Sequence, residues 1–159
     1  MVSKEDFRNN NIFGNLTDDM LDKLLPLAEV LHMEARDFVF KEGDAVENLF
    51  TIKRGTVLIE QRISDKITVT AGTTTAGESF GFSSLFKEGT YSTNAVCADQ
   101  CELIVINGEA LMDLLKNDHS MGFYIMQNIA IVFGSRIQRR TEQFLRAMTS
   151  HPEIHELGD

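Results

Sequence analysis

The residues of this chain best suited to chemistry lie between positions 77 and 95, which read GESFGFSSLFKEGTYSTNA. Glycines at Gly81 and Gly89 enclose a short serine-containing stretch, which is the outline of a segment that captures a phosphate. Backbone N–H groups at the start of a helical turn can bind such an anion, because they are unpaired and carry partial positive charge.

Composition limits the classes of protein that could contain this segment. A chain of 159 residues, 43% hydrophobic and 25% charged, suits a single globular domain over residues 1–159. The formal net charge of -9 argues against direct nucleic-acid binding and against adsorption to an anionic membrane. Two cysteines and no apolar leader or membrane-length run predict a cytoplasmic protein with free thiols.

The elements that must position the segment change in character along the chain. Residues 11–36 show helical spacing after Thr17, a candidate N-cap, and Pro26 interrupts them. Residues 37–106 contain short runs of β-branched and aromatic residues separated by glycines, which predicts a double-stranded β-helix, or jelly roll. Residues 107–148 return to helical spacing, with a long final helix. A polar tail over 149–159 completes a fold that is mainly β with flanking helices.

Three stretches, at 12–31, 38–59 and 77–95, resemble one known family in their order and spacing. They resemble the cyclic-nucleotide-binding domain of the catabolite activator and of the anaerobic regulators related to it. The resemblance covers roughly residues 12 to 146 and implies a non-catalytic sensor module acting in signal transduction. In the family's transcription factors a helix-turn-helix domain follows the long helix, and we expect no counterpart of it in this sequence.

The resemblance identifies residues 77–95 as the family's phosphate-binding cassette, with Gly81 at the glycine position. In that family a glutamate holds the ribose 2′-OH and an arginine pairs with the phosphate, whereas this chain has Phe82 and Ser92 there. Loss of the arginine removes a charge-assisted hydrogen bond worth about 1.5–3 kcal/mol. No arginine lies between Arg62 and Arg136, and the cations nearest in sequence are Lys66 and Lys87.

Three interpretations of this degenerate cassette remain open. In the first, the pocket binds another small ligand, with Phe82 as an apolar wall and neighbouring hydroxyl and N–H groups as polar contacts. In the second, the pocket is closed and the chain is a ligand-free dimeric scaffold. In the third, it is an atypical cyclic-nucleotide binder. The candidate ligand contacts are Gly81, Phe82, Ser83, Ser84, Ser92 and Thr93 and, from the resemblance, Ser135 and Arg136.

The long helix is apolar nearly all round over residues 121–133, so one face can cover the β-roll and the rest needs another partner. The resembled family pairs this helix with its twin. We therefore expect a homodimer through Met121, Ile125, Ile129, Val132, Phe133 and Ile137. We expect the arginines near the end of this helix, Arg136, Arg139, Arg140 and Arg146, to form mainly a solvated face.

Other residues of reactive type do not form a recognisable constellation. Cys97 and Cys101 are spaced C-x3-C, and we expect both to be small core residues. His151 and His155 lie in the polar tail, where we do not expect a metal site. The sequence has no nucleophile elbow and no P-loop. It thus predicts no catalytic residue, no metal and no cofactor, and a small-molecule effector as the possible ligand.

Overall fold

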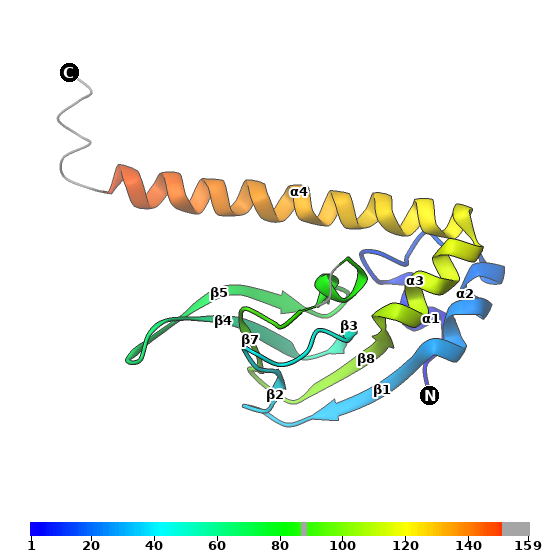
Figure 1. Ribbon diagram of the computed structural model, residues 1–159, viewed down its shortest axis with the longest axis horizontal. Coiled ribbons are helices and arrows are strands. Elements are labelled where there is room, and N and C mark those ends of the chain that lie inside the picture. The colour runs from blue at the N-terminus through cyan, green and yellow to red at the C-terminus, as the bar shows by residue number, and fades with distance from the viewer. Residues whose placement is uncertain (87–88, 151–159) are drawn as a thin grey trace, which may run out of the picture.

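Two antiparallel four-stranded sheets form a β-roll that is flanked by helices at one end and along one side (Figure 1). The computed structural model describes residues 1–86 and 89–150. One sheet has the strand order β1-β8-β3-β6 and the other β2-β7-β4-β5. The predicted fold is confirmed. The strands are β1 (Ala28–Met33), β2 (Phe38–Phe40), β3 (Asn48–Arg54), β4 (Thr56–Ser64), β5 (Ile67–Thr75), β6 (Ser79–Phe80), β7 (Asn94–Cys97) and β8 (Cys101–Asn107).

Aromatic rings fill the interior of the roll. Phe40 stacks on Tyr91 with ring centroids 3.6 Å apart, and Phe50 stacks on Phe80 at 5.2 Å. The two cysteines are buried in the same cluster, as predicted, and burial raises the pKa of Cys97 to about 12. Such thiols act as small apolar side chains rather than as nucleophiles.

The N-terminal helices are shorter than the sequence predicts. Thr17 caps α2 (Asp18–Leu24) as expected, and the 3-10 turn η1 (Leu25–Leu27) follows at the proline. The expectation of helix up to residue 36 is wrong, because residues 28–33 form β1 and pair with β8. Leu31 had suggested a helical stripe, yet its side chain is exposed. A further helix, α1 (Lys4–Arg8), lies before the predicted start at residue 11.

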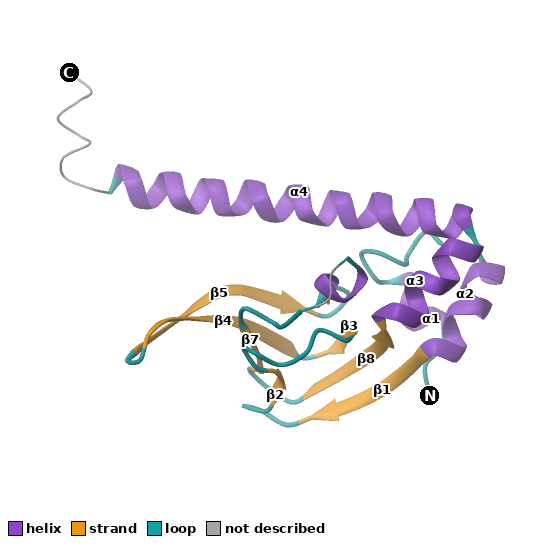
Figure 2. Ribbon diagram, viewed as in Figure 1, coloured by secondary structure: helices purple, strands orange, loops and turns teal. Residues whose placement is uncertain are grey.

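The C-terminal helices follow the predicted boundaries closely. Asn107 caps α3 (Gly108–Asn117) by accepting from the backbone N–H of Ala110 at 3.0 Å. The long helix α4 (His119–Thr149) begins at Asp118, whose carboxylate accepts from the N–H of Met121 at 3.0 Å. Figure 2 shows α4 starting beside the short helices and continuing past the strands.

The first turns of α4 belong to the core of their own domain. Met121, Ile125 and Ile129 are buried among the short helices and the adjoining strands. These three residues therefore do not lie on an exposed surface, and their assignment to a dimer interface is wrong. The reason is the helical period. Residues spaced three and four apart form the most apolar side of α4, and this side packs on its own domain rather than on a partner.

Candidate functional site

The cassette occupies a sharp turn between β6 and the 3-10 turn η2 (Phe82–Leu85). Gly81 adopts a left-handed conformation with a φ of 80°, and a Cβ there would lie 2.8 Å from the carbonyl oxygen of Asn48. Only glycine meets both conditions without strain. Gly81 therefore aims the residues that follow it, and its carbonyl accepts from the N–H and the hydroxyl of Ser84 at 3.2 and 2.9 Å.

The turn separates the two cassette serines. Ser83 is exposed and lines a cavity beside the roll. Ser84 points back to Gly81, and its backbone packs so closely on Gly108 at the start of α3 that a Cβ there would lie 2.3 Å from the Ser84 carbonyl oxygen. Ser84 thus holds the turn against α3 and is not among the cavity-lining residues.

Phe82 connects the cassette to the long helix. Its side chain is only 4% exposed and meets Phe133 of α4 edge-to-face, with ring centroids 5.3 Å apart. The guanidinium carbon of Arg136 lies 5.1 Å from the centre of the same ring. Phe82 is therefore both a core residue and a wall of the cavity.

Arg136 brings a positive charge to this wall. Its Nη2 donates to the carbonyl oxygen of Ser79 at 2.8 Å. Burial lowers the pKa of the Arg136 guanidinium, as do Arg139 and Arg140, while Glu78 raises it. An arginine side chain stays charged under such conditions. A guanidinium thus lies beside the cassette although position 92 lacks one, and it comes from the helix rather than from the roll.

These residues line a cavity of about 810 Å³ between the roll and the second half of α4. Its walls combine three kinds of side chain. Aromatic and aliphatic groups include Phe40, Val46, Ile59, Phe80, Phe82, Phe86, Tyr91 and Phe133. Neutral polar groups include Gln61, Thr70, Thr73, Thr74, Ser83, Thr90, Ser92, Thr93 and Gln143. The charged groups among the described lining residues are Arg136, Arg139 and Arg140.

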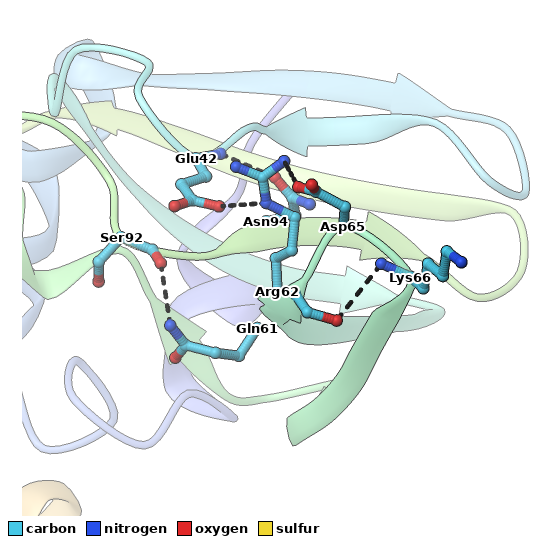
Figure 3. Close-up of polar contacts among 8 residues, drawn as sticks. Glu42, Gln61, Arg62, Asp65, Lys66, Ser92 and Asn94 are labelled. Carbon is cyan, nitrogen blue, oxygen red and sulfur yellow. Dashed lines mark hydrogen bonds and ion pairs between the residues drawn. The ribbon is translucent and has the colours of Figure 1, made fainter.

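Ser92 lies at the rim of the cavity and is exposed. Its backbone carbonyl accepts from the Gln61 side chain at 3.5 Å, as Figure 3 shows. Arg62, the next residue on β4, points elsewhere and lies 3.9 Å from Glu42 and 4.0 Å from Asp65. It is therefore engaged outside the cavity and does not supply the guanidinium missing at position 92.

Six of the eight residues predicted to contact a ligand line this one cavity: Gly81, Phe82, Ser83, Ser92, Thr93 and Arg136. Ser84 and Ser135 do not, and Ser135 is exposed on α4. Three further lining residues were not predicted. The sequence assigned Arg139 and Arg140 to a solvated face, and Gln143 was not singled out. Their spacing of three, four and seven residues from Arg136 was the signal that could have placed them on the same helical face.

The remaining sequence candidates add nothing to this site. Within residues 1–86 and 89–150, no group of three or more His, Cys, Asp or Glu side chains could hold a metal ion. Lys87, His151 and His155 lie outside the described residues. Among the described helices, none is both long enough and apolar enough to cross a membrane.

The comparisons with known proteins agree with this geometry. The model of the cyclic nucleotide-binding domain family matches residues 30–118. A cyclic nucleotide-binding protein of Geobacter metallireducens GS-15 is 27% identical with a TM-score of 0.75, over 86% of this chain and 99% of that one. The catabolite activator protein of Thermus thermophilus is 22% identical with a TM-score of 0.71, over 88% and 63% of the two chains.

A third solved structure, the c-di-GMP-responsive global regulator CLP of Xanthomonas campestris, is 24% identical with a TM-score of 0.75, over 85% and 66% of the two chains. A search of curated proteins gave no match. The β-roll, the turn at Gly81 and the long helix are thus the architecture of a cyclic nucleotide-binding domain. The chain belongs to the cyclic nucleotide-binding domain family.

The position of Phe82 yields a prediction about stability. We expect Phe82→Ala to lower the free energy of unfolding by about 3–5 kcal/mol, because a buried ring leaves a cavity when it is removed. The matched control is Phe86→Ala, which removes a half-exposed ring four residues later and should cost less than about 1 kcal/mol. Urea unfolding followed by far-UV circular dichroism gives both values, and equal values would contradict the assigned role.

Proposed function

We propose that this chain senses a small organic anion, which binds in the cavity between the β-roll and α4. The observation that carries the proposal is Arg136, a guanidinium that lines the cavity beside the cassette. Arginine has five N–H donors, and one hydrogen bond, to Ser79, engages Arg136 among the described residues. Donors remain for an anionic group, and a guanidinium suits carboxylates and phosphates.

The size of the cavity favours a ligand over a collapsed scaffold. Small-molecule sites are usually about 300–1,000 Å³ and combine apolar walls with a few polar groups. The volume of about 810 Å³ and the mixed lining meet that description. The Xanthomonas campestris regulator is c-di-GMP-responsive, so cyclic dinucleotides belong with cyclic mononucleotides among the compounds to test. The two free thiols suit the reducing cytoplasm, where we place the module.

The mechanism follows from which elements carry the lining residues. Arg136 and Phe133 belong to α4, while Phe82, Ser92 and Thr73 belong to the roll and its cassette. An anion held by both parts adds contacts that exist only when the helix lies over the roll. Binding therefore stabilises that position of α4 relative to any other, and the helix transmits the ligand's presence as a shift in population.

The test is ligand-induced stabilisation, measured by thermal unfolding with cAMP, cGMP, cyclic dinucleotides and small inorganic anions. A true ligand at about 100 times its Kd adds about 2.7 kcal/mol to the wild-type protein. Arg136→Gln should remove most of this gain, because a charged hydrogen bond is lost. The control is Arg146→Gln on the same helix, beyond the cavity, which should keep it. If no compound stabilises the wild-type protein, the sensor proposal is wrong, and the interpretation as a ligand-free scaffold is favoured.

A second proposal concerns another face of α4, which we propose pairs with a second copy of the chain. Phe123, Ile137 and Phe144 are 63%, 66% and 61% exposed and, with the exposed Ala130, recur every seven residues. A repeat of seven keeps these side chains on one side of the helix, as one of the two apolar heptad positions of a coiled-coil seam does. Large exposed rings along one line also indicate a covered surface. Ile137 is the one member of the sequence-predicted interface that lies on this seam.

The double variant Ile137→Glu/Phe144→Glu tests the pairing. It should shift the protein from dimer to monomer, since two carboxylates from each chain would meet in an apolar seam. Ser135→Glu adds a carboxylate on another face of the same helix and should leave the dimer intact. Sedimentation velocity at several concentrations reports the state, and a wild-type monomer at high micromolar concentration would overturn the proposal.

A further inference from the structure

One face of α4 changes its chemistry where the helix leaves the core. Ile125 and Ile129 on this face are buried in the domain. At the next turns the same line reaches Arg136, Arg140 and Gln143, which line the cavity together with Arg139. These spacings of three and four residues keep the side chains on one side of a helix. The helix thus turns from apolar to cationic over the stretch that faces the cavity.

The positive charge in the cavity is only partly offset by the described protein groups, because Glu78, which raises the pKa of Arg136, is not among the lining residues. None of the described lining residues is an aspartate or glutamate. The ion pairs formed within residues 1–86 and 89–150 engage other cations, and none engages Arg136, Arg139 or Arg140. Three positive charges therefore gather in one hollow of a protein whose net charge is -9. A positively charged cavity of this kind raises the local concentration of anions and favours anions of higher charge over those of lower charge.

The three charges fall into two zones. Arg136 is the inner one, half-buried between Phe82 and the carbonyl of Ser79. Arg139 and Arg140 are exposed and lie one turn further along the helix. One turn corresponds to about 5 Å of helix rise. A ligand with two acidic groups can contact both zones, whereas a ligand with one acidic group contacts Arg136 alone.

The wall beside these charges is aromatic. Phe133 and Phe86 keep part of their rings exposed, and their centroids are 6.4 Å apart. Both line the same cavity as the arginines. Exposed rings next to guanidinium groups suit a planar aromatic group that stacks on the ring faces while its acidic groups meet the cations. The volume of about 810 Å³ is also more than a small inorganic anion fills.

We infer that the ligand is an aromatic organic anion with at least two negative charges, of the chemical class of nucleoside monophosphates and cyclic dinucleotides. This inference rests on the proposed sensing function and specifies the ligand class of the same cavity. One acidic group lies at Arg136 and the other at Arg139 and Arg140, with the aromatic part against Phe86 and Phe133. A singly charged cyclic mononucleotide uses only the inner zone and binds more weakly.

The experiment compares probes that differ by one feature, using titration calorimetry on the full chain. Adenosine has the ring and no charge, cAMP the ring and one charge, and AMP the ring and two charges. Cyclic di-AMP has two rings and two charges, while pyrophosphate has charge and no ring. We expect AMP, cyclic di-AMP or both to bind at least about tenfold more tightly than cAMP, which is what one further charged contact contributes.

The variant Arg139→Gln/Arg140→Gln separates the two charge zones. We expect it to weaken binding of the dianionic probe by at least about tenfold and to change cAMP binding by less than about threefold. Arg146→Gln, which removes one charge from the same helix outside the cavity, should leave both unchanged. Thermal unfolding of the ligand-free variants checks that they remain folded.

The possible results distinguish this inference from the proposed function. If cAMP binds as tightly as the dianions and the double variant has no effect, the inference is overturned while sensing stands. If pyrophosphate binds as well as AMP and cyclic di-AMP, the aromatic part is overturned. If the wild-type protein binds none of the probes, both the inference and the sensing proposal are overturned.

Discussion

The contact between Arg136 and the cassette is the interaction on which the functional geometry depends. The guanidinium covers the ring of Phe82 and donates to the carbonyl of Ser79. The hydroxyl of Ser79 in turn lies 2.8 Å from that of Thr51 and accepts from the Asn10 side chain at 2.9 Å. One residue of α4 is thereby joined to the cassette, to a central strand and to the N-terminal segment.

The same contact explains why the cavity suits an anion. Taking a guanidinium out of water is costly unless hydrogen bonds and opposite charge replace the lost hydration. The ring of Phe82 supplies a cation–π contact of about 0.5–2 kcal/mol, and Ser79 supplies one acceptor. Neither neutralises the charge. An anionic ligand would complete these interactions and would hold α4 over the roll.

The sequence predicted the fold well because its signals were local. Glycine turns, β-branched runs and the caps at Thr17 and Asn107 each specify structure within a few residues. The strand at residues 28–33 was not predicted, because its pairing with β8 joins residues 68 to 78 positions apart and its leucine spacing also fits a helix. A period alone does not separate a short strand from the end of a helix.

The candidate site was predictable only in part, because some of its residues are brought together by contacts between segments distant in the sequence. Gly81 and Phe82 belong to a contiguous segment with a recognisable order of residue types. Arg139 and Arg140 reach the cavity because α4 folds back across the roll. Their spacing from Arg136 places the three arginines on one side of the helix, but the local sequence does not show that this side faces the roll. The direction of Ser84 likewise depends on the close approach of Gly108 from α3.

Hydrogen exchange of α4, measured by mass spectrometry with and without the compound that stabilises the protein most, tests the central claim most directly. The claim predicts slower amide exchange over residues 136–149 and in β4–β5 when ligand is bound. Residues 121–129 should change little because they are already buried. A ligand that binds and leaves exchange in α4 and β4–β5 unchanged would contradict a binding site between the roll and the helix.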